Sequence, residues 1–295
     1  MLTLALSPRK VGVYALVQIT ASEIRDQDAK MTARTTIKLE TRDGIATLTL
    51  NRPEVLNSIN TAMIAEIREA VKEVAADENA RLLLITGEGR AFCAGADLAA
   101  QGQRTEGMSI GEGVAHGMKI GFNPMMSELY ALEKPIITAV NGTTAGGGVG
   151  LALVADIVVA AQSASFISVF GPKLGLIPDL GTTWQLPRLV GRARAMGIAI
   201  TGDKIPAETA AEWGLIWKCV PDAELMSTVG ALAQKIAKGP SNAFSEIRKA
   251  IDIAPHKSYD DQLEYERVTQ GQLGDHPNFA EGVKAFLTKR EAQFK

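Results

Sequence analysis

The chain has 295 residues, of which 46% are hydrophobic and 22% charged, a composition typical of a globular protein with a sizeable core. Its formal net charge is −2, which excludes recruitment of nucleic acid or an anionic membrane by a global field. No apolar run approaches the roughly 20 residues that span a bilayer. Cys93 and Cys219 lack the spacing of a disulfide motif or metal site, which favours a reducing compartment. We therefore expect a cytoplasmic protein with no nucleic-acid or membrane partner.

The chain begins with a segment that does not predict a folded element. Its apolar pieces are interrupted by Pro8-Arg9-Lys10, and residues 22–30 are polar and charged. Neither feature matches a secretory signal. We interpret residues 1–35 as a disordered arm or as an extension from a misplaced start, and we expect them to be dispensable for folding.

The first regular elements alternate between strand and helix. Residues 45–50 alternate in polarity as a strand does, and residues 82–86 form an apolar run typical of a buried strand. Between them, Asn60 is a candidate N-cap for a helix whose apolar residues recur every three to four positions. This strand–helix–strand order predicts an α/β fold.

The later elements continue this alternation and then become helical. We expect a mobile loop or loose helix at 99–123, which could serve as a substrate lid, and a helix at 125–132. Strands are expected at 136–140 and 156–160, with a helix at 149–155 between them. Beyond Pro187 the composition predicts helices only, at 190–200, 207–213, 225–238, 242–253, 259–272 and 278–294.

Two glycine-containing loops each follow an apolar strand. The first runs Ala91-Phe92-Cys93-Ala94-Gly95-Ala96-Asp97-Leu98, and the second runs Asn141-Gly142-Thr143-Thr144-Ala145-Gly146-Gly147-Gly148. Each leads toward a helical stretch, where backbone N–H groups lack intrahelical partners. Two such groups aimed at one oxygen form an oxyanion hole. For either loop alone, the glycines could equally serve only tight turns.

These loops carry a family resemblance. Together with Asn51-Arg52-Pro53, Lys173-Leu174-Gly175-Leu176-Ile177-Pro178-Asp179 and Leu186-Pro187-Arg188, they occur in the order and at spacings typical of the crotonase, or enoyl-CoA hydratase/isomerase, family. The resemblance covers roughly residues 36–295. It implies a spiral of ββα units over 36–235, and a C-terminal helical region over 236–295 that assembles a homotrimer or homohexamer.

The resemblance also implies a substrate and an oxyanion hole. The substrate is an acyl-CoA thioester, with coenzyme A as part of it and no tightly bound cofactor. Ala96 and Gly147 match the positions whose N–H groups hold the thioester oxygen. A thioester carbonyl gains negative charge when an adjacent C–H loses its proton, so such donors lower the barrier.

The acid–base residues depart from the hydratase pattern. Hydratases of this family use two glutamates, and this chain has Gly150 at the first position and Phe170-Gly171-Pro172-Lys173 around the second. Asp179 instead matches the acid–base aspartate of isomerases that act on ring 1,2-epoxyphenylacetyl-CoA. One carboxylate can remove a proton and return it elsewhere, which suffices for isomerisation. The structural alternative is that Asp179 caps the helix that follows.

Coenzyme A binding is implied at two places. The resemblance places the nucleotide near Ala94, Ala96, Asp97 and Leu98, and Phe286 and Lys289 match a C-terminal pair that reaches the nucleotide, often from a neighbouring subunit. A lysine suits phosphate as a point charge. Asp97 could instead be a structural turn residue, and Lys289 a solvated lysine on an amphipathic helix.

The sequence thus predicts an acyl-CoA isomerase acting on ring-epoxyphenylacetyl-CoA or a Δ3,Δ2-enoyl-CoA, with phenylacetate catabolism as its implied context. One alternative is a hydratase whose water is held by Asp179 or by a lid glutamate, Glu106 or Glu112. Another is a pseudoenzyme that binds acyl-CoA without turnover. No metal site is predicted, and Gly87-Glu88-Gly89 lacks the third glycine of a dinucleotide fingerprint.

Overall fold

The computed structural model describes residues 34–99 and 107–295. The arm expected at 1–35 therefore lies almost wholly outside the described residues, and so does Glu106 of the expected lid. Thr35–Lys295 form one compact unit. The expected boundary at 235/236 inside that unit stays a prediction.

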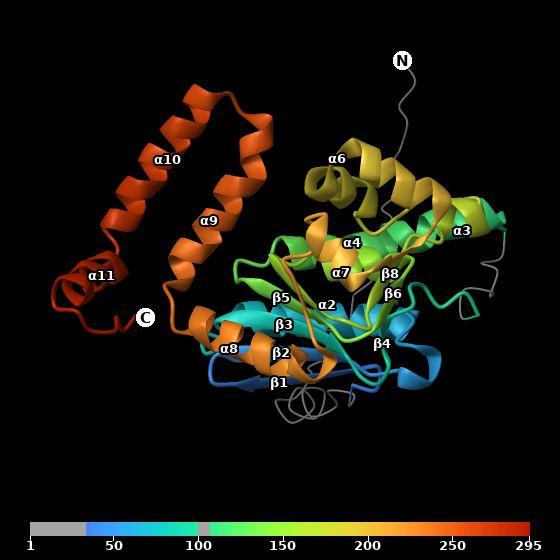
Figure 1. Ribbon diagram of the computed structural model, residues 1–295, viewed down its shortest axis with the longest axis horizontal. Coiled ribbons are helices and arrows are strands. Elements are labelled where there is room, and N and C mark those ends of the chain that lie inside the picture. Colours follow the sequence, from blue (N-terminus) through green and yellow to red (C-terminus); the bar gives the residue numbers. More distant parts are fainter. Residues whose placement is uncertain (1–33, 100–106) are drawn as a thin grey trace, which may run out of the picture. The chain divides into compact units, whose positions relative to one another are not determined.

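The larger sheet has six strands, in the order β1-β2-β3-β5-β7-β10 (Figure 1). Their bounds are Ile37–Arg42 for β1, Ile45–Leu50 for β2, Leu82–Gly87 for β3, Ile136–Val140 for β5, Ile157–Ala161 for β7 and Lys218–Val220 for β10. Only β1 runs antiparallel to its neighbour, and the other pairs are parallel. The expected strands at 45–50, 82–86 and 136–140 are confirmed, and the strand expected at 156–160 begins one residue later.

The smaller sheet has the order β4-β6-β8-β9. Its strands are only three residues long: Ala91–Cys93, Thr143–Ala145, Ser165–Ile167 and Lys204–Pro206. Pairs β4-β6 and β6-β8 are parallel, and β8-β9 is antiparallel. None of these strands was predicted, because three residues carry too little periodicity.

Successive turns of the chain place one strand in each sheet and then a helix. β3 and β4 precede α3 (Ile110–Gly117) and α4 (Asn123–Tyr130), β5 and β6 precede α5 (Gly147–Leu153), and β7 and β8 precede α6 (Thr182–Thr201). This repeat confirms the predicted spiral of ββα units.

The core lies between the large sheet and its covering helices. β3 and β5 are buried on both faces, which explains why they read as continuous apolar runs rather than as alternating strands. Helix α2 (Thr61–Ala76) begins at the predicted N-cap, because the Asn60 side chain accepts a hydrogen bond from the Met63 N–H. Helix α8 (Leu225–Ala237) packs on β3, β5 and β7.

The segment expected as a lid forms a short helix in its described part. Helix α3 starts at a capping box, in which the Ser109 side chain accepts from the Glu112 N–H and the Glu112 carboxylate accepts from the Ser109 N–H. Residues 118–122 continue it as a wider π-helical turn that leads into α4.

The chain beyond β10 is helical, as predicted, but β9 and β10 interrupt the helices expected beyond Pro187. It contains α9 (Ser241–Ile253), α10 (Tyr259–Gly274) and α11 (Pro277–Leu287), which follow one another at the end of the chain (Figure 1). The expected extension of the last helix to Phe294 is wrong. The helix ends at Leu287, and Lys289 has a left-handed backbone with φ of 54°.

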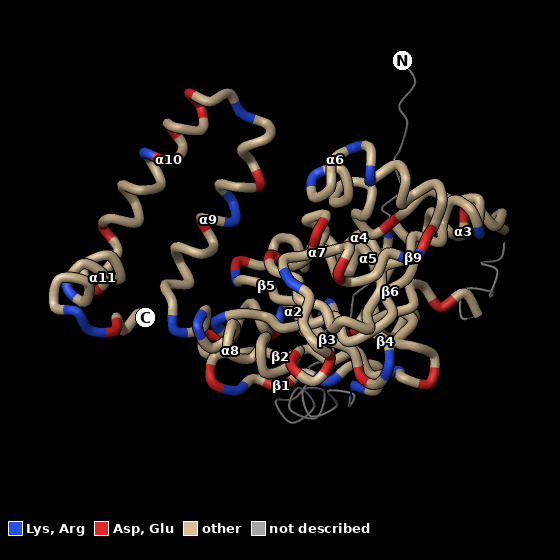
Figure 2. Tube along the Cα trace, in the orientation of Figure 1, with Lys and Arg blue, Asp and Glu red and all other residues tan. Residues whose placement is uncertain are grey.

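Charged residues of both signs are interspersed along the described part of the chain (Figure 2). Helix α9 is tied to the spiral by ion pairs. Arg248 lies 2.8 Å from Asp156, and Lys249 lies 2.8 Å from Glu133. These contacts attach the C-terminal helices to the ends of β5 and β7.

Candidate active site

The two glycine loops lie directly against each other. A β-carbon on Gly95 would come 2.9 Å from the Ala145 carbonyl oxygen and 3.0 Å from the Gly147 nitrogen. Gly95 also has a φ of +94°, which side-chain-bearing residues rarely adopt. A residue with a side chain at position 95 would therefore force the two loops apart.

The N–H groups proposed for the oxyanion hole are not used by regular structure. Ala96 forms a parallel bridge with Ile59, in which the Ile59 N–H donates to the Gly95 carbonyl and the Asp97 N–H donates to the Ile59 carbonyl. The Ala96 N–H takes no part in the hydrogen bonds of this bridge. Gly147 is the first residue of α5, where an N–H has no intrahelical acceptor. Both groups are therefore available to an oxygen of a ligand.

Asp179 lies at the same place. Its Oδ1 is 3.4 Å from the point that a β-carbon on Gly147 would occupy. Oδ1 is buried and has no hydrogen-bond partner among the described residues. Burial raises the pKa of Asp179 to about 6, against a smaller opposing effect of its own backbone N–H. A perturbed carboxyl group beside unused N–H donors is typical of a catalytic acid–base residue.

The structural alternative for Asp179 is not supported. Helix α6 has Gly181 as its N-cap, and no side chain caps it. At the helix start it is the backbone carbonyl of Asp179 that accepts a hydrogen bond, from the Thr182 N–H at 2.9 Å. The carboxylate therefore does not stabilise the helix start.

The missing glutamate at position 150 has a steric reason. A β-carbon on Gly150 would overlap the Leu180 carbonyl oxygen and come 2.9 Å from the Thr182 hydroxyl. The chain that carries Asp179 thus occupies the space of a side chain at position 150. The second hydratase segment, Phe170–Leu174, is a π-helical turn without a carboxylate.

The candidate lid carboxylate Glu112 is engaged elsewhere, and so is Glu128 on the neighbouring helix α4. The Ser109 N–H and hydroxyl lower the pKa of Glu112 within its capping box. Glu128 accepts two hydrogen bonds from the Arg68 guanidinium, at 2.9 and 2.6 Å, which lower its pKa. Both are held as anions by structural partners.

Sequence reasoning offered Asp97 as a structural turn residue but missed its partner Arg52, which holds the first loop. The Arg52 guanidinium donates to the Asp97 carboxylate at 2.8 Å and to the Ser58 carbonyl at 2.7 Å. Both side chains of this ion pair are mostly buried. Removal of one partner from such a pair typically costs about 3–5 kcal/mol. Asp97 therefore has a structural role, and contact with a nucleotide stays a prediction.

The Asn57 side chain joins the same loop to neighbouring segments by hydrogen bonds. Asn57 is fully buried with a φ of 56°, and its amide donates to the carbonyls of Glu88 and Ala91. Its oxygen accepts from the Arg52 N–H. The signal for this role was its place in Asn51-Arg52-Pro53-Glu54-Val55-Leu56-Asn57, since asparagine tolerates left-handed backbone.

Aromatic and cationic side chains fix the start of α6, just beyond Asp179. Trp184 packs edge-on against Tyr130 of α4, with ring centroids 5.7 Å apart. The Arg188 guanidinium stacks 3.8 Å from the centre of the Trp184 ring. Such contacts are worth about 0.5–1 kcal/mol each when exposed, and they anchor the helix that follows the Asp179 turn.

The residues predicted to bind coenzyme A lie in two separate parts of one chain, and their joint role stays a prediction. Ala94 and Leu98 lie on the first loop, where the Ala94 N–H donates to Leu56 and Leu98 is 60% exposed. Phe286 is 83% exposed on α11, and Lys289 follows that helix. Among the described residues, no hydrogen bond or ion pair joins the two groups.

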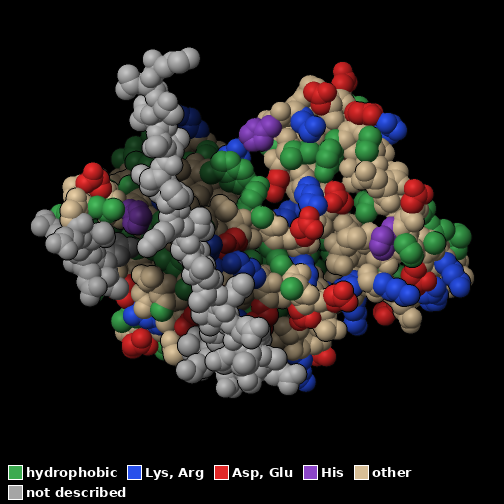
Figure 3. Space-filling view, turned by 180° about the vertical axis from the view of Figure 1, so that it is seen from behind, with side chains coloured by type: hydrophobic (Ala, Val, Ile, Leu, Met, Phe, Trp, Pro, Cys, Tyr) green, Lys and Arg blue, Asp and Glu red, His purple; other side chains and the backbone are tan. Residues whose placement is uncertain are grey.

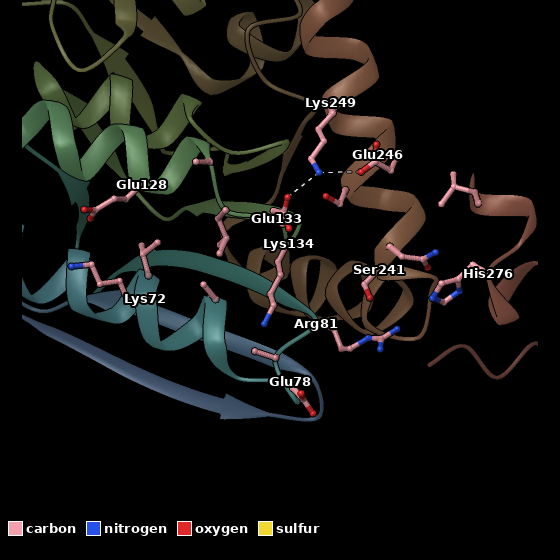
Figure 4. A pocket seen from close by; sticks show the side chains of 18 of the residues that line it. Lys72, Glu78, Arg81, Glu128, Glu133, Lys134, Ser241, Glu246, Lys249 and His276 are labelled. Atoms are coloured by element: carbon pink, nitrogen blue, oxygen red, sulfur yellow. Dashed lines mark hydrogen bonds and ion pairs between the residues drawn. The ribbon is translucent and has the colours of Figure 1, made fainter. Parts of the chain in front are cut away.

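A cleft of about 820 Å³ lies elsewhere, lined by residues of α2, α4, α9 and α10, by the segments that follow α2 and α4, and by His276 (Figure 4). Lys134 points into it and donates to the carbonyls of Val74 and Asp77 at the end of α2. Several lysine and glutamate side chains line this cleft. None of the lining residues belongs to the Ala96, Gly147 and Asp179 site.

The described residues 34–99 and 107–295 contain no cluster of side chains suited to a metal ion. They also contain no helix with the length and apolarity to cross a membrane. Cys93 is buried, and both cysteines are free thiols.

Comparison with known proteins identifies the family of the chain. The family model for enoyl-CoA hydratase/isomerase matches residues 40–295. A 1,2-epoxyphenylacetyl-CoA isomerase of Escherichia coli is 47% identical over 251 residues, which cover 85% of this chain and 95% of that protein. A probable enoyl-CoA hydratase of Rhodobacter capsulatus is 43% identical over 265 residues, 88% of this chain and 97% of that protein.

Solved structures show the same fold. An enoyl-CoA hydratase from Bacillus anthracis is similar with a TM-score of 0.82 at 31% identity, and the similarity covers 88% of this chain and 99% of that one. A putative enoyl-CoA hydratase/isomerase from Mycobacterium abscessus gives a TM-score of 0.81 at 32% identity, over 88% and 99% of the two chains. The chain therefore belongs to the crotonase, or enoyl-CoA hydratase/isomerase, family.

Proposed function

We propose that this protein is an acyl-CoA isomerase that works with a single carboxylate, Asp179. The proposal depends on what surrounds two neighbouring glycines of α5, Gly147 and Gly150. Asp179 reaches the oxyanion-hole residue Gly147, and the backbone of the same turn fills the space that a glutamate at position 150 would need.

The chemistry follows from these positions. The N–H groups of Ala96 and Gly147 hold the thioester oxygen, and Asp179 removes a proton from the carbon adjacent to the thioester carbonyl. The negative charge then moves to the oxygen, where two donors stabilise it; one donor is typically worth about 3–4 kcal/mol. Asp179 returns the proton at another carbon or oxygen, which completes an isomerisation without water.

The pKa of Asp179 suits both halves of this cycle. With a pKa of about 6, the carboxylate is mostly ionised at neutral pH and can accept a proton. It is also a stronger base than an ordinary aspartate, so the proton transfer is less unfavourable. Burial supplies this change without a second acidic residue.

The substrate class is an acyl-CoA thioester, and the favoured acyl groups are ring-epoxyphenylacetyl and 3-enoyl chains. The isomerase name of the Escherichia coli relative supports the first of these and a place in phenylacetate catabolism. The hydratase name of the Rhodobacter capsulatus relative supports a second candidate function, in which Asp179 alone holds the water that is added. Turnover of any of these thioesters would exclude a pseudoenzyme.

A panel of thioesters separates these candidates. Purified protein should isomerise a 3-enoyl-CoA or an epoxyphenylacetyl-CoA, whereas crotonyl-CoA hydration should be absent or very slow. Each missing acid or base typically costs about 10²–10⁴ in rate, and the two hydratase glutamates are both missing. Hydration of crotonyl-CoA at about 10² per second, within the common range for enzymes, would contradict the proposal.

We also propose a homotrimer or homohexamer assembled through the C-terminal helices. Figure 3 shows hydrophobic side chains on the surface of the molecule. In the C-terminal helices the exposed large apolar side chains are Ile247, Ile251, Leu263, Val268, Phe279, Val283, Phe286 and Leu287. Exposed apolar surface of this kind marks an interaction site. Sedimentation velocity should give a trimer or hexamer, and a monomer at micromolar concentration would contradict this assembly.

A further inference from the structure

Asp179 stands at the start of an unusual turn. The Thr182 N–H donates to the Asp179 carbonyl, and the two residues between them, Leu180 and Gly181, have φ of 49° and 78°. Positive φ at both central positions is the pattern of a type I′ turn, for which Asn-Gly is the favoured pair. Leucine is unfavourable at the first of these positions, because its β-carbon crowds the backbone.

The strained backbone places the Leu180 side chain on the oxyanion hole. Its two δ-carbons each lie 3.3 Å from the point that a β-carbon on Gly147 would occupy, and Asp179 Oδ1 lies 3.4 Å from the same point. Leu180 is only 3% exposed, and Oδ1 is buried without a hydrogen-bond partner in the described part of the chain. The apolar side chain and the carboxylate thus share one small space above Gly147.

Water exclusion is the main influence on this carboxylate. Burial has the largest effect on its pKa, and the N–H of Asp179 itself has a smaller opposing effect. No charged side chain of the described residues contributes. The elements packed against the turn present Gly147 and Gly150 from α5 and the Thr182 hydroxyl from α6, none of which titrates.

We propose that Leu180 is a positioning residue, held in a left-handed conformation so that its side chain covers Asp179 and Gly147 and keeps the carboxylate dry. Its consequence for turnover rests on the proposed function, but the covering itself does not. Strain of this kind persists where the surrounding structure determines it, typically at functional sites.

Two variants at position 180 separate covering from packing. Leu180→Asn suits the left-handed backbone and removes the apolar cover, whereas Leu180→Met keeps an apolar cover on the same strained backbone. Leu180→Ala removes the cover without introducing a hydrogen-bond donor. It replaces Leu180→Asn as the test if the asparagine variant does not fold. The control is Leu215→Ala. It also creates a leucine-to-alanine cavity at a buried position, but outside the turn.

The readout is the pKa of Asp179 itself, measured by carbon NMR of protein labelled at its aspartate carboxyl carbons and assigned with Asp179→Asn. We expect the pKa to fall by about one unit or more in Leu180→Asn and Leu180→Ala, toward the value of a solvated aspartate. It should stay close to wild type in Leu180→Met and Leu215→Ala. An unchanged pKa in both variants that lack the cover would overturn the proposal.

Turnover gives a second, separate test. Because the base must be ionised, the acidic limb of kcat/KM for isomerisation should move to lower pH in Leu180→Asn, and the plateau should fall several-fold as the base weakens. If the pKa of Asp179 falls in Leu180→Asn and Leu180→Ala as expected, but the wild-type protein catalyses no isomerisation, the proposed function fails while the role of Leu180 stands. If isomerisation is present but its acidic limb does not move in Leu180→Asn, the role of Leu180 fails alone.

Discussion

Isomerisation should fall by about 10² or more in Asp179→Asn, whereas acyl-CoA binding should stay within a few-fold of wild type. Asparagine keeps the size of aspartate but cannot act as a base at neutral pH. Asp179 Oδ1 makes no hydrogen bond within the described residues that the fold would lose. Steady-state kinetics with calorimetric titration of a thioester measures both quantities on one preparation.

The same variant should be more stable than wild type at neutral pH. Burial raises the pKa of Asp179 from 3.8 to about 6, so the folded state disfavours the anion. The cost is absent below pH 4, grows through pH 6 and is complete above it, and two units correspond to on the order of 2–3 kcal/mol. Thermal unfolding at pH 7.5 should therefore show a higher Tm for Asp179→Asn.

Glu112→Gln is the matched control. Glutamine preserves a capping box, so this variant should keep both stability and activity. Near-normal isomerisation by Asp179→Asn would make Asp179 structural and would move the search to the engaged carboxylates Glu112 and Glu128 and to Glu106.

The second large effect is expected at position 150. Gly150→Glu, which restores the glutamate of the hydratase pattern, should lose isomerisation by about 10² and gain no hydration. Its β-carbon would overlap the Leu180 carbonyl and lie 2.8 Å from the Leu180 β-carbon, so the Asp179 turn must move. Overpacking costs about 1–3 kcal/mol. A displacement of about 1 Å at a reacting group can cost 10² in rate.

Gly150→Ala isolates the steric part of this effect, and Gly230→Ala is its control. Both glycines lie inside helices, but a β-carbon on Gly230 would meet no atom within 4 Å. Alanine at 230 should therefore raise the free energy of unfolding by about 0.5–1 kcal/mol, whereas alanine at 150 should lower it. An active, undestabilised Gly150→Glu that hydrates crotonyl-CoA would contradict the assignment of this space to the Asp179 turn.

Elements with a strong local pattern were predictable from the sequence. The apolar runs of β3 and β5, the alternation of β2 and the N-cap at Asn60 each signal their structure within a few residues. The smaller sheet was not predictable in this way. β4 pairs with β6 some fifty residues later, and tertiary pairing rather than local propensity defines such short strands.

The site shows the same division. The glycine loops were found from their own pattern and Asp179 from the resemblance to a family, and the structure brings Gly95, Gly147 and Asp179 together. The left-handed Leu180 carries no sequence signal, because leucine is not a residue expected there. The end of α11 was misplaced because residues 288–294 keep a helical composition, although the backbone turns at Lys289.

The central claim is that one carboxylate moves a proton and no water is added. Proton NMR of a 3-enoyl-CoA incubated with the wild-type protein in D₂O tests this claim in a single sample. We expect the wild-type protein to convert this thioester to the 2-enoyl-CoA with no 3-hydroxyacyl-CoA formed, and Asp179→Asn to fail in this conversion. Accumulation of the 3-hydroxyacyl-CoA, or equal conversion by Asp179→Asn and wild type, would contradict the claim.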